Sequence, residues 1–157
     1  MKKILLGIIL INFAALATAE NSGQELSPSQ VVTKAYETFS AGDMEGWSAL
    51  HSKDLTFTIL GDLPQSGSHK GTQATIENVF GVLPVHWPGF NLTELNRYTV
   101  ANTVIVHLKM TAKGLETESL HKFEIVDGKI SSFTAFDDTQ SMFIAMKKNI
   151  EKAKTEN

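Results

Sequence analysis

Apolar residues along the chain change their spacing near residue 90, from a helical period to an alternating one. In the first part, Ser27-Pro28-Ser29-Gln30 has the form of a capping box with proline at the first helical position. Apolar residues then recur at helical spacing, at Val32, Ala35, Tyr36 and Phe39. Gly42 is a typical helix end, and Asp43 can cap a second, short helix whose shared side carries Met44, Trp47, Leu50 and His51.

The remaining segments predict an α+β domain. Residues 55–59 alternate and predict a half-buried strand, and residues 61–71, rich in glycine with Pro64, predict a mobile loop. A third helix is expected from about Thr72, with Ile76, Val79, Phe80 and Leu83 buried. Four strands then follow, at residues 90–100, 103–112, 117–126 and 129–137. A final helix, capped by Asp137 or Asp138, returns to the body. Helices followed by antiparallel strands predict N-terminal helices packed on one face of a curved antiparallel sheet.

The closing hairpin decides which side chains face inward. A two-residue loop at Asp127-Gly128 pairs His121 with Thr134 and scatters the apolar positions. A three-residue loop with Gly128 in the left-handed region pairs His121 with Phe133, Phe123 with Ser131, and Ser119 with Ala135. We predict the second register, because it gathers the apolar residues with His121 on one face and places Asp137 on that face too. The shared inner face then holds His121, Phe123, Ile125, Phe133 and Ala135.

The first residues have the pattern of a cleavable export signal. Lys2 and Lys3 precede an apolar run over residues 4–17, and Ala17-Thr18-Ala19 has the small-x-small form that signal peptidase accepts. The run is shorter than a membrane span needs. We therefore expect a signal peptide at residues 1–19, cleaved after Ala19, and one domain at residues 20–157. After cleavage we expect no membrane attachment, so the protein should be periplasmic or secreted.

Charge and composition narrow the range of partners. Removing Lys2 and Lys3 leaves 12 Lys and Arg against 17 Asp and Glu, a net charge of −5. Nucleic-acid binding calls for a clustered basic face, so we expect no nucleic-acid partner. The chain has no cysteine, and its five histidines lack the close pair spacings of zinc sites. We expect neither a metal nor a cofactor.

The order of elements resembles the NTF2-like superfamily, and within it the SnoaL-like and ketosteroid isomerase-like proteins. The resemblance covers residues 28–142 and rests on the order of the elements. A helix ending at Ala41-Gly42-Asp43 is followed by a short helix, a strand, a long loop and a third helix. Four strands complete the order, and the turn Asp127-Gly128-Lys129-Ile130 joins the last two of them. It implies a cone of curved sheet around helices, a pocket at the wide end and frequent dimers. Members range from isomerases, dehydratases, cyclases and epoxide hydrolases to proteins without activity, so the fold alone implies no reaction.

The isomerase chemistry does not carry over to this sequence. The ketosteroid isomerases use a tyrosine, an aspartate base and a second aspartate. Counted from Ala41-Gly42-Asp43, the tyrosine position falls on Ala35, next to Tyr36. The position of the base falls on Ile59, and that of the second aspartate falls on His121. Ile59 cannot accept a proton. The resemblance therefore implies a pocket without ketosteroid isomerisation.

His121 is the best candidate for chemistry, because a histidine that faces an apolar cavity can act as acid, base or hydrogen-bond donor. The alternative is a buried histidine satisfied by a backbone carbonyl or by Tyr36. Asp137 can orient His121 or act as a base, although capping the last helix is its favoured role. The expected pocket residues are Tyr36, Phe57, Ile59, Trp87, Phe123 and Phe133, with Trp87 at the rim.

Three functional hypotheses follow. The first is an exported protein, expected as a homodimer, that holds a small apolar ligand and, if it is an enzyme, uses His121 for proton transfer. The second is a non-catalytic dimeric binding or interaction module whose pocket is filled by its own side chains. The third is epoxide-type hydrolysis, which requires the single arginine of the chain, Arg97, to face the cavity.

Overall fold

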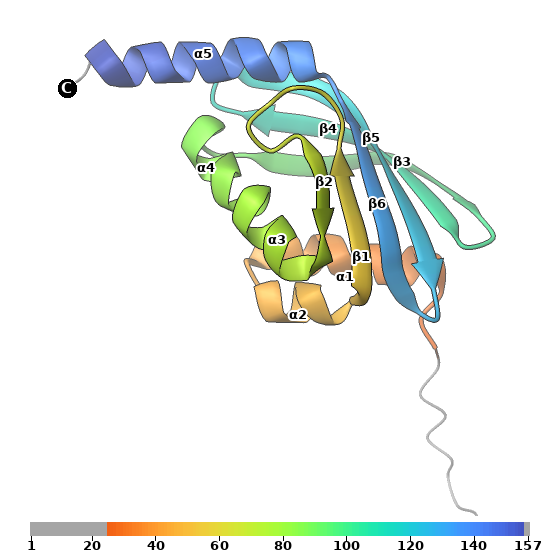
Figure 1. Cartoon of the computed structure of the whole chain (residues 1–157). Coiled ribbons are helices and arrows are strands. Elements are labelled where there is room, and N and C mark those ends of the chain that lie inside the picture. Colours follow the sequence, from red (N-terminus) through yellow and green to blue (C-terminus); the bar gives the residue numbers. More distant parts are fainter. Residues whose placement is uncertain (1–24, 156–157) are drawn as a thin grey trace, which may run out of the picture.

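A computed structural model describes residues 25–155 and shows helices packed against a curved sheet (Figure 1). The predicted signal peptide lies outside the described residues. The elements follow in the order α1 (Pro28–Ala41), α2 (Met44–Ala49), β1 (His51–Ile59), β2 (Gly67–Lys70), α3 (Gly71–Asn78), the 3-10 turn η1 (Phe80–Val82), α4 (Leu83–His86), β3 (Asn91–Val100), β4 (Thr103–Ala112), β5 (Leu115–Val126), β6 (Lys129–Asp137) and α5 (Thr139–Thr155).

The six strands form one sheet in the order β2-β1-β6-β5-β4-β3. Among the strands of residues 25–155, only β1 and β6 pair in parallel, and the other neighbours are antiparallel. The sheet curls strongly, so that β3 and β4 run across behind the steeper β1 and β6, and α5 lies over one end (Figure 1). The predicted α+β class, with helices on a curved antiparallel sheet, is confirmed.

Both N-terminal helices begin where the sequence predicts. Ser27 Oγ accepts a hydrogen bond from the Gln30 amide at 3.3 Å, and Gln30 Oε1 accepts one from the Ser27 amide at 2.9 Å, which completes the capping box. Gly42 ends α1 with a φ of 69°. Asp43 then caps α2 by accepting a hydrogen bond from the Gly46 amide at 2.8 Å.

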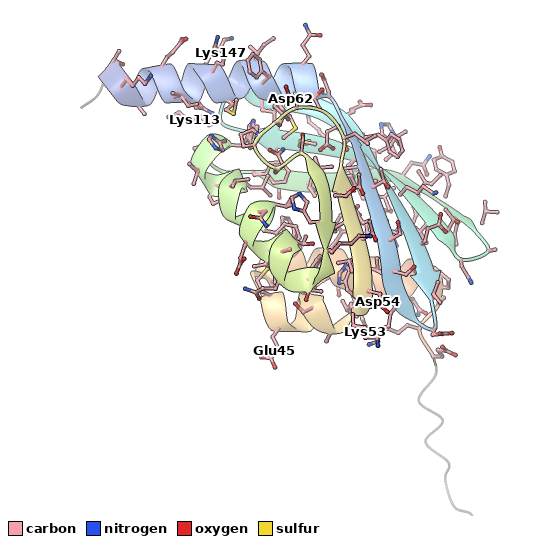
Figure 2. All side chains as sticks on the ribbon, viewed as in Figure 1. Glu45, Lys53, Asp54, Asp62, Lys113 and Lys147 are labelled. Atoms are coloured by element: carbon pink, nitrogen blue, oxygen red, sulfur yellow. The ribbon has the colours of Figure 1, made fainter. Side chains whose placement is uncertain are left out.

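The main core lies between α1 and the concave face of the sheet. Val31, Val32 and Ala35 of α1 are buried in one cluster with alternate residues of β4, namely Val104, Val106 and Leu108. Charged side chains such as Glu45, Lys53 and Lys147 point outward instead (Figure 2). None of the helices within residues 25–155 is long and apolar enough to cross a membrane.

The region between β1 and β3 differs from the prediction in two ways. Residues 67–70 form the edge strand β2 rather than loop, and the loop before it buries Leu63 and Gln65. The expected third helix is divided into α3, η1 and α4. Local composition predicts flexibility here, whereas pairing of β2 with β1 supplies long-range contacts that composition does not encode.

The predicted register of the β5–β6 hairpin is wrong, although the predicted faces are right. The turn is a two-residue loop in which Asp127 and Gly128 both have positive φ, 49° and 69°. A bulge at Ser131 then shifts the pairing, so that His121 lies opposite Ala135, Phe123 opposite Phe133, and Ser119 opposite Asp137. The observed register differs from the predicted one by two residues, and an even shift leaves every side chain on its predicted face.

Candidate functional site

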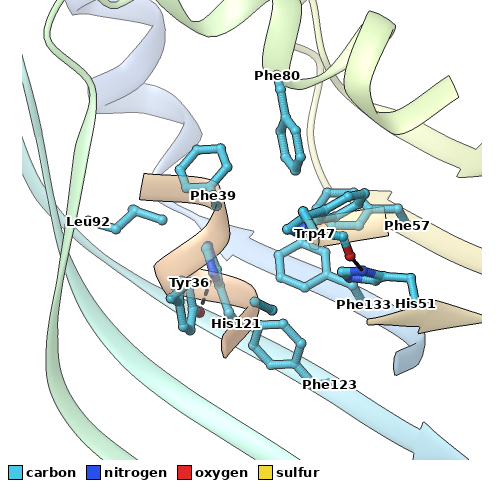
Figure 3. A pocket seen from close by; sticks show the side chains of 11 residues that line it. Tyr36, Phe39, Trp47, His51, Phe57, Phe80, Leu92, His121, Phe123 and Phe133 are labelled. Atoms are coloured by element: carbon cyan, nitrogen blue, oxygen red, sulfur yellow. Dashed lines mark hydrogen bonds between the residues drawn. The ribbon is translucent and has the colours of Figure 1, made fainter. Parts of the chain in front are cut away.

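The concave face carries two adjoining pockets that share part of their lining, each about 50 Å³ in volume. We call them the first and the second lobe of the cavity. Figure 3 shows the first lobe, into which side chains from α1, α2, the sheet and η1 point. His121 lines both lobes, so it stands at their junction. The residues common to the two lobes are Phe39, Phe57, Phe80, Leu92, His121 and Phe133.

The first lobe is almost entirely aromatic. Phe57 and Phe133 stack with ring centroids 4.0 Å apart, and Phe123 meets Phe133 edge-on at 5.0 Å. Phe80 lies across from them, 5.8 Å from Phe57. Of the described residues, none that lines either lobe is a lysine or an arginine. Such a surface favours a flat, uncharged ligand.

His121 lies between two other polar side chains, Tyr36 and Asp137, in a line. The phenol oxygen of Tyr36 lies 2.9 Å from His121 Nδ1, and His121 Nε2 lies 3.7 Å from Asp137 Oδ1. Ser119 Oγ donates to Asp137 Oδ1 at 2.5 Å. His121 and Ser119 are buried, and the Asp137 side chain is only 7% exposed. The hairpin register produces this line, because Ser119 and Asp137 are direct partners across β5 and β6.

Burial keeps the phenol group of Tyr36 protonated. Desolvation raises the pKa of the Tyr36 phenol far above its ordinary value; Arg97 opposes this shift, while Glu94 and Asp137 add to it. Tyr36 therefore keeps its proton and can donate it to His121 Nδ1. On the other side of the ring, the Asp137 carboxylate can only accept, which favours a neutral His121 with its proton on Nε2 and with Nδ1 as the acceptor of the Tyr36 hydroxyl.

Asp137 does not cap the last helix. Asp138 Oδ1 accepts the hydrogen bond of the Ser141 amide at 3.0 Å, and Thr117 donates to Asp138 Oδ2 at 2.8 Å. The favoured interpretation of Asp137 as the cap is therefore wrong. Its neighbour takes that role, and the Asp137 carboxylate lines the second lobe.

Five of the six predicted pocket residues line the cavity. Tyr36 and Phe123 line the first lobe, Ile59 the second, and Phe57 and Phe133 both. Trp87 was predicted at the rim, and this prediction is wrong. It is fully buried in a separate core cluster with Leu83 and Met110, and its indole donates to the Met142 carbonyl oxygen at 3.0 Å.

The sequence prediction missed His51 as a cavity residue. His51 is the first residue of β1, its ring lies 3.8 Å from that of Trp47, and its Nδ1 donates to the Trp47 carbonyl oxygen at 2.7 Å. Burial lowers the pKa of His51 to about 4; the Trp47 hydrogen bond opposes this shift and Lys129 adds to it. The ring is therefore neutral near pH 7, with its proton on Nδ1 and an acceptor at Nε2. Its helical spacing from Trp47 was the only signal in the sequence.

Gln65 was also missed, because it lies in the segment predicted as a mobile loop. Its side chain lines the second lobe and is 2% exposed, and its amide oxygen has no hydrogen-bond partner within residues 25–155. The glycine and serine content around it gave no signal of burial.

Arg97 does not line the cavity. It lies in an outer cleft of about 290 Å³ between α1 and β3, where it pairs with Glu94 at 2.5 Å. The guanidinium also donates to the Ser29 carbonyl oxygen at 2.7 Å and to Thr33 Oγ1 at 2.8 Å. Arg97 therefore ties β3 to α1, and the arrangement that epoxide hydrolysis requires is absent from the described cavity lining.

His107 lies outside the cavity and pairs with Glu118 at 2.7 Å on a partly exposed part of the sheet. Within the described part of the chain, no three His, Asp or Glu side chains gather as metal ligands.

Solved structures with the same architecture include NTF2-like proteins and candidate polyketide cyclases. An NTF2-like protein from Burkholderia thailandensis is 24% identical, covers 77% of this chain and 98% of its own, and superimposes with a TM-score of 0.72. TerC, crystallised with polyporic acid, is 18% identical, with coverage of 77% and 99% and a TM-score of 0.69. IdmH from Streptomyces antibioticus, a candidate polyketide cyclase, is 17% identical, with coverage of 77% and 99% and a TM-score of 0.64.

No functionally curated protein matches the sequence. The sequence profile of the SnoaL-like domain matches residues 32–133, which is most of the segment from α1 to β6. These matched residues include Tyr36, His51, Gln65 and His121. The chain belongs to the SnoaL-like domain family and has the NTF2-like fold.

Proposed function

We propose that this protein binds a small, uncharged, unsaturated carbonyl compound in the two-lobed cavity and transfers a proton from the carbon next to the carbonyl group. The observation that carries the proposal is the position of His121 at the junction of the lobes, with Nε2–H beside the Asp137 carboxylate. The candidate cyclase and the polyporic acid complex among the similar structures support a ligand of this broad kind.

His121 and Asp137 have complementary roles in this reaction. At 3.7 Å the Nε2–H group is too far from Asp137 Oδ1 for a strong hydrogen bond, so it is available to a ligand carbonyl oxygen. Asp137 accepts one hydrogen bond from Ser119 and retains lone pairs that can take a proton. Asp137 removes the proton of the C–H bond, and His121 stabilises the negative charge that develops on the carbonyl oxygen. Tyr36 maintains the required tautomer.

Binding without chemistry is the second candidate. It is favoured by the volume of the lobes, about 50 Å³ each, which is small beside most ligand sites. A planar ligand then enters only if rings such as Phe39 and Phe80 turn aside.

Deuterium exchange tests both candidates without a known substrate. Acetophenone in D₂O exchanges its methyl protons through the enol, and proton NMR follows both this exchange and binding. We expect the wild-type protein to accelerate exchange, and Asp137→Asn to lose about 10²-fold or more of the acceleration. Asp138→Asn serves as the matched control and should retain the acceleration of exchange. Binding without acceleration identifies a non-catalytic pocket, and absence of binding overturns the proposal.

We also propose export, with cleavage after Ala19, on the strength of Lys2, Lys3 and the Ala17-Thr18-Ala19 pattern. The intact mass of protein recovered from the periplasm or medium tests it. A mature chain that begins at Met1 contradicts it.

A homodimer through the outer face of the sheet is the proposed assembly. Leu120 and Phe136 lie opposite each other on β5 and β6 and are 44% and 49% exposed. Light scattering of wild type and of Phe136→Lys tests it, with a dimer expected only for the wild type. A monomeric wild type overturns this assembly.

A further inference from the structure

The most unusual polar group of the inner surface is the side-chain amide of Gln65. Only 2% of this residue is exposed, and it lines the second lobe among apolar neighbours such as Ile59 and Phe90. Its Oε1 atom has no hydrogen-bond partner in the part of the chain that the structure describes. A buried polar atom without a partner costs free energy, so a residue retained at that cost calls for an explanation.

The backbone around Gln65 holds the side chain in this position. The Ser66 amide donates to the Leu63 carbonyl oxygen at 2.9 Å, and the Leu63 amide donates to Ser66 Oγ at 2.9 Å. The backbone carbonyl oxygen of Gln65 accepts a hydrogen bond from His69 Nε2 at 3.0 Å, which links the loop to β2. The turn is closed by these hydrogen bonds, so the side-chain amide of Gln65 is not needed to close it.

The chemistry of the second lobe restricts what this amide can recognise. The Asp137 carboxylate lines the same lobe, and none of its described lining residues is a lysine or an arginine. A negatively charged ligand group is therefore disfavoured. A neutral hydroxyl group fits, because it donates a hydrogen bond to Oε1.

We infer that Gln65 is a ligand-recognition residue that binds a hydroxyl group of the ligand in the second lobe. This inference rests on the proposed function, since it takes the carbonyl group of the ligand to lie at His121. The ligand class then narrows to neutral aromatic or conjugated carbonyl compounds that also carry a hydroxyl group within reach of the Gln65 side chain. Gln65 selects among ligands and takes no part in proton transfer.

Two probes of nearly equal size test the inference, 4-hydroxyacetophenone and 4-methylacetophenone, titrated by NMR or calorimetry. We expect the wild-type protein to bind the hydroxyl probe about tenfold more tightly, as one neutral hydrogen bond formed in a buried site allows. Gln65→Leu should remove this preference while leaving the affinity for the methyl probe within about twofold. Gln140→Leu, on the exposed side of α5, is the matched control and should keep the preference.

Thermal stability provides a second measurement. Removing an unpaired buried amide should leave the melting temperature of the ligand-free protein unchanged or raised. Gln65→Met, closer in shape to glutamine, replaces Gln65→Leu if the leucine variant does not fold. If the folded variant still prefers the hydroxyl probe, the inference is wrong. It is also wrong if the melting temperature falls while both affinities stay unchanged, because the side-chain amide then stabilises the fold or binds a buried water. If the methyl probe binds and the hydroxyl probe binds no more tightly, only this inference fails. If neither probe binds, the proposed function fails as well.

Discussion

The phenol oxygen of Tyr36 lies 2.9 Å from His121 Nδ1, and this single hydrogen bond connects α1 to β5 across the inner surface. The two rings are nearly parallel, at 16° with centroids 6.1 Å apart. Because Tyr36 donates, His121 presents Nε2–H to the cavity and to Asp137. The two neighbours of the ring, Tyr36 at Nδ1 and Asp137 at Nε2, together decide which His121 nitrogen carries the hydrogen-bond donor.

Tyr36→Phe should release this constraint. The ¹⁵N spectrum of wild-type His121 should show one tautomer, protonated at Nε2, and the variant should show a mixture. Loss of the hydroxyl leaves a buried ring nitrogen without a partner, so the free energy of unfolding should fall by about 1 to 3 kcal/mol. Tyr98→Phe is the matched control on the exposed strand β3 and should leave the His121 spectrum unchanged. A wild-type His121 protonated at Nδ1 contradicts the assignment.

His51 should make stability depend on pH. Its pKa in the folded protein is about 4, below the ordinary 6.5, so the unfolded chain binds the proton more readily between these values. Stability is then fully present above about pH 6.5 and falls as the pH is lowered toward 4, by about 3 kcal/mol at most.

Urea unfolding at a series of pH values measures this loss. His51→Asn, whose amide can still donate to the Trp47 carbonyl oxygen, should reduce the slope between pH 6.5 and 4. His107→Asn, on the partly exposed face, is the control and should retain the slope. Equal slopes in wild type and His51→Asn contradict the prediction.

Trp87 should matter for stability and not for ligands. Trp87→Phe removes the hydrogen bond to the Met142 carbonyl oxygen and part of a fully buried ring, at a cost of about 2 kcal/mol. Acetophenone affinity should stay the same. Trp47→Phe provides the contrast, because Trp47 lines the first lobe and its truncation should change that affinity. An effect of Trp87→Phe on affinity with unchanged stability would restore the rim interpretation.

Gly128→Ala should destabilise the hairpin by about 1 kcal/mol, because alanine disfavours the left-handed conformation that Gly128 adopts with a φ of 69°. Gly81→Ala is the control, since Gly81 has no positive φ and its added methyl group makes only ordinary contact with the Ile76 carbonyl oxygen at 3.5 Å. Chemical unfolding of both variants gives the comparison. An equal or larger loss at Gly81 would contradict the backbone argument.

Local rules in the sequence predicted much of the fold correctly. The capping box at Ser27, the glycine end at Gly42 and the β6 strand at residues 129–137 were confirmed. These features depend on residues a few positions apart, so the chain records them directly. Alternation also predicted the correct inner face of the last hairpin, including His121 and Phe133.

Tertiary structure decided the features that depend on residues far apart in the chain. The bulge at Ser131 sets the register, and so places Asp137 opposite Ser119. Thr117 on β5 donates to Asp138, which caps α5 and leaves Asp137 in the cavity, although either aspartate suits the local capping pattern. His51 and Gln65 join the cavity only when the sheet curls around α1 and β2 pairs with β1. Their neighbours in sequence say little about this burial, because burial is a property of the packed chain.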